Sequence, residues 1–225
     1  MGYQKQNRKL AATSVNLIHF YKAIPEPMAD TPTQGSIWRQ NLVLFKGKHY
    51  VISATSGKGK TTLLNMVCGI RKDYRGDVFF DETNLRTLND GAFAELRSKD
   101  ISCLFQDLRL FPDLTAMENI CLSPITAINE ADILALARKI GVQEHLQKPC
   151  RKLSLGQQQR IALIRSLSRP FQWLLLDEPF SHLDEFNAKL AMDLILETAE
   201  RQQAGIIATA LGHSGLFNDF QWLEL

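Results

Sequence analysis

The chain has 225 residues, 45% of them hydrophobic, and a formal net charge of +2. This length suits one large α/β domain, and so small a charge gives no support for a nucleic-acid partner. No apolar run reaches the roughly 20 residues that span a bilayer, and residues 1–14 lack the apolar core of a signal peptide. The four cysteines form no C-x-x-C pair, which favours reduced, mostly buried thiols in a cytoplasmic protein and gives no zinc site.

The N-terminal quarter of the chain predicts an antiparallel pair of strands and then a third strand. Three prolines and a glycine in residues 24–35 predict a loop, and an alternating apolar pattern on either side of it predicts strands. The predicted segments are a loose tail over residues 1–12, strands over 14–23 and 37–45, a turn over 46–48 and a strand over 49–53.

A glycine-bearing loop follows the strand over residues 49–53 and precedes an apolar helix that ends near Gly69. This order matches a P-loop, in which backbone N–H groups at a helix N-terminus hold phosphates. Lys60 would reach the β- and γ-phosphates, and the Thr61 hydroxyl would bind Mg²⁺. A plain Gly/Ser turn is the alternative, because Ala54 replaces the first glycine of the motif. The candidate phosphate-binding residues are Ser56, Gly57, Lys58, Gly59, Lys60, Thr61 and Thr62.

The middle of the chain alternates short strands with helical patterns. An apolar run over residues 101–105 has strand length and ends at Gln106. The other predicted segments are a strand and turn over 76–81 and helices over 90–99, 114–120 and 130–140.

The second informative stretch is Leu153-Ser154-Leu155-Gly156-Gln157, which precedes a helix with apolar residues three apart. Ser154 and Gly156 would therefore lie at a helix N-terminus, where free N–H groups attract an anion. Simple N-capping of the helix by Ser154 is the alternative.

The third informative stretch is the apolar run Trp173–Leu176, followed by Asp177 and Glu178. Such a run predicts a central parallel strand that is buried on both faces, and ligands bind at the carboxyl ends of such strands. Asp177 would bind Mg²⁺, and Glu178 would polarise an attacking water. A loop or cap with two acidic residues is the alternative. A helix over 185–202 and strands over 205–209 and 220–225 complete the prediction.

Together, the P-loop, Gln106, Leu153–Gln157, Leu174–Pro179 and Ser181–Asp184 make the chain resemble the ATP-binding subunits of ABC transporters over nearly its whole length. The resemblance implies an α/β fold over residues 1–225: a P-loop NTPase core with a mostly parallel sheet, an antiparallel β subdomain and an inserted helical subdomain at about 107–168. The stretch around Gln106 and Leu114–Ile120 looks most like the lipoprotein-releasing, macrolide-exporting and cell-division group.

The resemblance also implies an ATPase with ATP and Mg²⁺ as cofactors, which forms a head-to-tail homodimer on integral membrane subunits at the inner face of the cell membrane. Glu178 would be the general base, and Gln106 would complete the Mg²⁺ and water site. Ser154 and Gly156 would touch the partner's ATP, Asp184 would lie at the dimer interface, and Tyr21 would stack on adenine, with Phe20 as the alternative.

Four departures from the family pattern point to weaker hydrolysis rather than weaker binding, and the first is Ala54 in the P-loop. Lys58 stands where a small residue is usual, and Leu155 replaces the first glycine of the signature pair. The usual histidine after Thr209 is Ala210, so His213 would serve only if the loop is rearranged. A low-turnover, nucleotide-gated clamp or regulatory subunit is therefore the alternative function.

Overall fold

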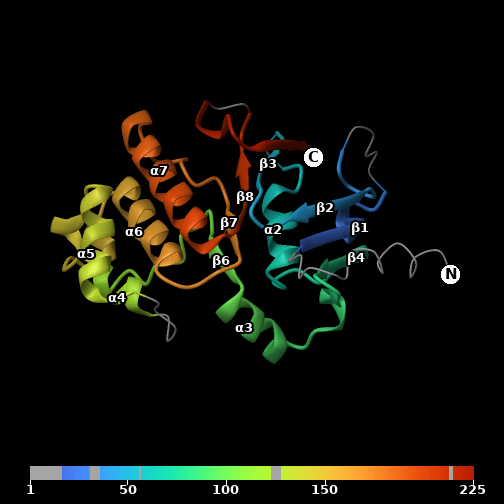
Figure 1. Cartoon of the computed structure of the whole chain (residues 1–225), viewed down its shortest axis with the longest axis horizontal. Coiled ribbons are helices and arrows are strands. Elements are labelled where there is room, and N and C mark those ends of the chain that lie inside the picture. The colour runs from blue at the N-terminus through green and yellow to red at the C-terminus, as the bar shows by residue number, and fades with distance from the viewer. Residues whose placement is uncertain (1–16, 31–35, 56, 123–127, 213–214) are drawn as a thin grey trace.

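The computed structural model describes residues 17–30, 36–55, 57–122, 128–212 and 215–225 (Figure 1). The molecule consists of two sheets and a group of helices (Figure 1). Helix α2 (Lys60–Val67) lies between the two sheets, and the group of helices lies at the end of the molecule away from the antiparallel sheet. The tail predicted over residues 1–12 and the candidate residues Ser56 and His213 lie outside the described residues.

The first sheet is antiparallel and has the strand order β2-β1-β4-β5. Phe20 of β1 lies opposite Leu42 of β2 and Val78 of β4, which confirms the predicted return strand. The strand begins at Asn41 rather than residue 37, because Arg39 has a left-handed φ of 61° and the backbone turns there. The strands are β1 Leu17–Pro25, β2 Asn41–Phe45, β4 Tyr74–Phe80 and β5 Thr83–Asn84.

The second sheet is parallel and has the strand order β6-β7-β8-β3-β9. Every residue of β7 and β8 is buried, as expected of central strands covered on both faces. The predicted parallel sheet is confirmed, and the carboxyl ends of neighbouring strands share one edge. The strands are β3 His49–Ser53, β6 Ile101–Leu104, β7 Trp173–Leu176, β8 Gly205–Ala210 and β9 Gln221–Glu224.

Helices cover both faces of the parallel sheet, and α4, α5 and α6 form the far end of the molecule, within the range predicted for a helical subdomain (Figure 1). Among the described residues, no helix combines the length and apolar character that a membrane crossing needs. The remaining α-helices are α3 Asp90–Lys99, α4 Ala116–Cys121, α5 Glu130–Lys139, α6 Leu155–Leu167 and α7 Glu185–Gln202. Short 3₁₀ turns are η1 Glu26–Met28, η2 Leu85–Thr87, η3 Gln143–His145, η4 Cys150–Lys152 and η5 Gly215–Phe217.

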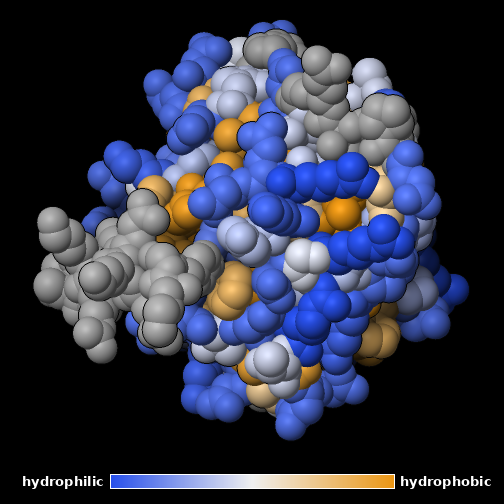
Figure 2. Space-filling model, turned by 90° about the vertical axis from the view of Figure 1, so that its right-hand side faces the viewer, coloured by the Kyte–Doolittle hydropathy of each residue, from blue (hydrophilic) through white to orange (hydrophobic). Residues whose placement is uncertain are grey.

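The side chains of β7 alternate between two hydrophobic cores. Leu174 and Leu176 join the core under the helices, whereas Trp173 and Leu175 join the core between the two sheets. Packing on both faces fixes β7 in the middle of the molecule, so the residues that follow it are held in place. The end that carries the antiparallel sheet is largely hydrophilic, with small hydrophobic areas between the polar side chains (Figure 2).

Candidate functional site

Helix α2 begins without a side-chain cap. Its N-cap residue is Gly59, which has a left-handed φ of 99° and no side chain to accept a hydrogen bond. The α-helices that follow it are each capped by a side chain, namely Asn89, Thr115, Asn129, Ser154 and Asp184. The first N–H groups of α2 thus keep their capacity to bind an anion, as the predicted P-loop requires.

The loop before α2 adopts its conformation without the first glycine of the motif. Ala54 is not among the residues with a positive φ, so its side chain adds no backbone strain. Gly57, three residues further along the loop, has a left-handed φ of 80°. Both Gly57 and Lys58 are exposed to solvent. Thr62, in the first turn of α2, is half-buried.

The side chain of Lys60 bridges the loop and the end of β7. Only 6% of it is exposed, and its Nζ donates a hydrogen bond to the Ala54 carbonyl oxygen at 2.9 Å. The same Nζ lies 3.5 Å from Glu178 Oε1. A buried ammonium needs such partners, and a phosphate in their place would satisfy it equally well.

A pocket of about 320 Å³ gathers the three predicted magnesium ligands, Thr61, Gln106 and Asp177. The other lining residues are Asn65, Phe105, Asp107 and Arg109. The pocket lies at the C-terminal edge of the parallel sheet, since Gln106 is two residues after the end of β6 and Asp177 comes directly after β7. Hydroxyl, amide and carboxylate oxygens are the hard donors that Mg²⁺ prefers, so the residues present fit that ion.

Glu178 is held by contacts from two other elements. Gln106 Nε2 donates to Glu178 Oε2 at 3.3 Å, and the Glu178 backbone N–H donates to the Thr209 hydroxyl at 3.0 Å. Thr209 in turn donates to Asp177 Oδ1 at 2.7 Å. Glu178 adopts a left-handed φ of 47°, a conformation that is costly for a side-chain-bearing residue and that neighbouring contacts must maintain.

The stretch around Ser154 shows the capping geometry that the sequence left open. The Ser154 hydroxyl accepts from the Gln157 N–H at 3.3 Å, and the Gln157 side chain accepts from the Ser154 N–H at 2.9 Å. Leu155 is 58% exposed. A Cβ on Gly156 would lie 2.8 Å from the His182 carbonyl oxygen, so glycine is required where α6 approaches the segment after Glu178.

The candidate adenine-stacking residue lies in the antiparallel sheet. Tyr21 is half-buried in β1, opposite Asn41 and Asp77, and its ring meets the His19 ring edge-on and the Lys22 ammonium. The residues that approach the P-loop at Gly59 are instead Met28 and Trp38, each 3.2 Å from a Cβ built there.

Sequence reasoning missed two buried polar residues that organise the site. Thr209 is fully buried and links Asp177 to Glu178. Gln159, 2% exposed, donates to the Glu178 carbonyl oxygen and accepts from the His182 N–H. A hydroxyl at the end of an otherwise apolar strand was a signal for Thr209, whereas one glutamine among three consecutive ones gave none.

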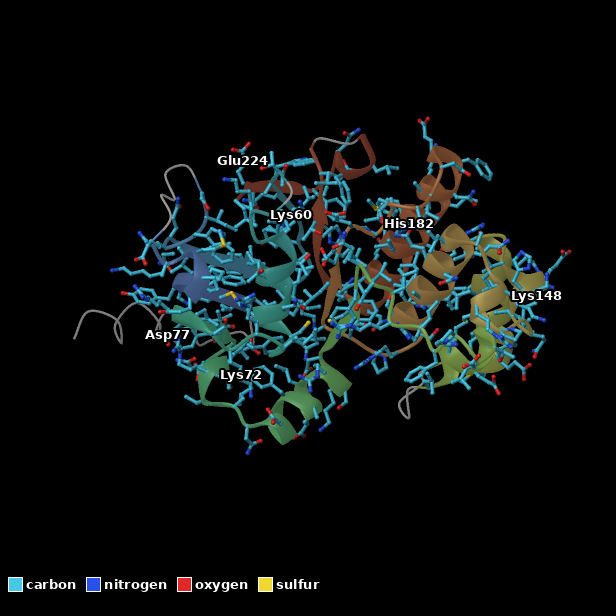
Figure 3. All side chains as sticks on the ribbon, turned by 180° about the vertical axis from the view of Figure 1, so that it is seen from behind. Lys60, Lys72, Asp77, Lys148, His182 and Glu224 are labelled. Carbon is cyan, nitrogen blue, oxygen red and sulfur yellow. The ribbon has the colours of Figure 1, made fainter. Side chains whose placement is uncertain are left out.

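Figure 3 shows how the site lies between the two ends of the molecule. Lys60 is near the middle of the view, His182 lies toward the side of α6 and α7, and Lys148 marks the far helical end. The P-loop and the α6 N-terminus are thus presented by different parts of the chain.

Asp184, which caps α7 beyond His182, has a pKa below its ordinary value because the Asn187 N–H donates to its carboxylate.

The chain is similar to proteins of one family by sequence and by fold. The sequence pattern described as ABC transporter matches residues 38–181. A lipoprotein-releasing system ATP-binding protein, LolD, of Saccharophagus degradans is 33% identical over 172 residues, covering 74% of this chain and 75% of LolD. A thiamine import ATP-binding protein, ThiQ, of Haemophilus ducreyi is 33% identical over 171 residues, covering 74% and 78%.

Solved structures share the fold. A dimeric bacterial ABC transporter cassette superposes with a TM-score of 0.78 at 22% identity and covers 92% of this chain and 94% of its own. A bacterial Atm1-family ABC exporter with ATP bound gives a TM-score of 0.78 at 20% identity, over 95% of this chain and 37% of the exporter chain. Together with the sequence matches, these results show that the chain belongs to the ABC transporter family.

Proposed function

We propose that this chain is an ATP-binding and ATP-hydrolysing subunit that drives a membrane transporter. The observation that carries the proposal is the pocket lined by Thr61, Gln106 and Asp177, next to an uncapped helix N-terminus. Free N–H groups and a buried lysine suit a triphosphate, and a carboxylate at the adjacent strand end suits activation of water.

The residues divide the work according to their positions. The N–H groups at the start of α2 and the Lys60 ammonium bind the phosphates, which replace the present contact of Lys60 with Glu178. Glu178, released from Lys60 and positioned by Gln106, accepts the proton of the attacking water. Thr61, Gln106 and Asp177 would hold Mg²⁺, which, when bound, neutralises charge on the phosphate oxygens.

The proposed assembly is a head-to-tail homodimer on integral membrane subunits at the inner face of the cell membrane, without nucleic acid. Two facts support the pairing: α6 begins away from the P-loop with Leu155 exposed, and the similar solved cassette is dimeric. In the dimer, Ser154 and Gly156 contact the ATP that the partner's P-loop holds. The relatives named for lipoprotein release and for thiamine import are equally identical to this chain, so sequence identity does not assign a direction of transport.

The Glu178→Gln variant tests the catalytic assignment. We expect it to bind ATP as wild type does and to lose hydrolysis, because an amide cannot accept the proton. Nucleotide binding is measured by calorimetry and hydrolysis by phosphate release. Lys60→Ala should lose both activities, whereas Lys72→Ala, which removes an exposed lysine paired with Asp90, should lose neither. Equal turnover in wild type and Glu178→Gln would overturn the assignment.

A further inference from the structure

Two free thiols lie side by side outside the proposed ATP pocket. Cys68 ends α2 and is 1% exposed, and Cys103 is half-buried in β6. Their Sγ atoms are 2.8 Å apart, although 35 positions separate them in the chain. A disulfide bond is about 2.05 Å long, so a bond between these sulfurs needs a movement of less than about one ångström.

A neighbouring pocket of about 260 Å³, which shares Phe105 and Arg109 with the proposed ATP pocket, leads to this pair. Cys103 lines it, as do four guanidinium-bearing residues, Arg97, Arg109, Arg165 and Arg169. Cys68 is not part of the pocket lining. A reagent that enters the pocket therefore meets Cys103 before Cys68.

The positive charge of this pocket is largely unneutralised. Arg97 and Arg165 donate to backbone carbonyls, which carry no full charge. Within the part of the chain that the structure describes, Arg109 alone of the four has a carboxylate within ion-pair distance, that of Asp107. Arg169 has two buried nitrogens, Nε and Nη2, without a hydrogen-bond partner among the described residues. Burial also lowers the pKa of Arg169, as expected of a cation that lacks an anion. Such a pocket attracts small anions.

We propose that Cys68 and Cys103 are a redox site that forms a reversible disulfide, with an anionic low-molecular-weight disulfide as the oxidant. Cys103 loses its proton to solvent, and its thiolate attacks one sulfur of the oxidant, forming a mixed disulfide and releasing one thiolate. Cys68 then loses its proton to that thiolate and attacks Cys103 Sγ, releasing the second thiolate, which takes up a proton from solvent. Two protein thiols are oxidised, and one external disulfide is reduced to two thiols.

The order of the two steps follows from the environment of each sulfur. The hydrogen bond to Cys103 and complete burial raise the pKa of Cys68 well above its ordinary value. Cys68 thus stays protonated until Cys103 has reacted, and it acts as the resolving thiol. The product joins the end of the helix that starts at Lys60 to the strand that leads to Gln106.

The test uses the full chain carrying Cys121→Ser, which removes the exposed thiol, treated with glutathione disulfide. We expect the loss of two hydrogen atoms from the protein mass and one cross-linked peptide containing Cys68 and Cys103. Reduction with dithiothreitol should reverse both changes. The oxidised form should unfold at a higher denaturant concentration, because the cross-link restricts the unfolded chain. A stable glutathione adduct at Cys103, or no reaction there, would overturn the proposal.

Matched variants separate the two cysteines. Cys121 is exposed and is not one of the two paired thiols, so the chain that keeps Cys121 should form the same disulfide and gain a separate adduct at Cys121. In a Cys121→Ser background, Cys68→Ala should instead accumulate one glutathione adduct at Cys103. If Cys121→Ser with Cys68 and Cys121→Ser with Cys68→Ala accumulated the same amount of adduct at Cys103, Cys68 would not be the thiol that displaces glutathione.

The charge of the oxidant tests the route of entry. Glutathione disulfide is anionic and cystamine is cationic, and we expect the anion to oxidise the pair about tenfold faster at low salt. Added salt should reduce this difference, since it screens the arginine charges. Equal rates at low salt would overturn the role of the arginine-lined pocket.

Discussion

Thr209 offers the sharpest test of how the site is held together. Replacing it with valine keeps the shape of the side chain and removes the hydroxyl that binds Asp177 Oδ1 at 2.7 Å and the Glu178 N–H at 3.0 Å. Asp177 is 3% exposed, so water does not replace the lost donor. A hydrogen bond to a charged group contributes about 2 kcal/mol and a neutral one about 1 kcal/mol. We expect Thr209→Val to lower the free energy of unfolding by about 3 kcal/mol.

Thr209→Ser is the matched control because it keeps the hydroxyl and deletes one buried methyl group, which costs about 1 kcal/mol. The smaller residue should therefore be the more stable variant, by about 2 kcal/mol. Equilibrium urea unfolding followed by circular dichroism measures the difference, provided that the slope m stays constant. If the valine variant matched or exceeded the serine variant in stability, the hydroxyl would not be the element that holds Asp177 and Glu178.

Three further predictions follow from single contacts. Gly156→Ala should cost about 1–3 kcal/mol of unfolding free energy, measured in urea, because its Cβ would lie 2.8 Å from the His182 carbonyl oxygen; Gly215→Ala, with nothing within 4 Å, should cost far less. Burial lowers the pKa of His49, so the unfolded chain binds more protons and stability should fall as pH drops through about 6.5; His49→Phe should flatten that part of the unfolding profile. Ala210→His should raise ATP turnover about tenfold in a phosphate-release assay, which corresponds to a barrier lower by about 1.4 kcal/mol. If turnover did not rise, the hypothesis that Ala210 limits hydrolysis would be wrong.

Periodicity predicted the elements best where local and tertiary preferences agree. The bounds of β3, α3 and α7 match the predicted segments. The predicted start of β2 at residue 37 was wrong. Trp38 looks like a strand residue in the sequence, yet it is buried in a turn beside the P-loop. Expectations for cysteine were also only partly met, since Cys121 is exposed.

The part of the candidate site that follows the ends of parallel strands was predictable from the sequence. Gln106 and Asp177 follow neighbouring parallel strands, and this topology brings their side chains to one pocket. Gln159 and Trp38 were not predictable, because their roles depend on contacts with segments that the local sequence does not specify. The Cys68–Cys103 pair has the same origin.

The contact between Lys60 and Glu178 would link phosphate binding to water activation in the proposed mechanism. The Lys60 ammonium lies 3.5 Å from the Glu178 carboxylate, in a place where only 6% of the lysine side chain and 15% of the glutamate side chain are exposed. Both groups need a partner there, because an unpaired buried charge is strongly unfavourable. In the proposed mechanism, a triphosphate would satisfy Lys60 and leave Glu178 free to accept a proton, so the base would become available when its substrate binds. Lys60→Ala would thus disturb Glu178 as well as phosphate binding, and the two variants should not be additive in their effect on turnover.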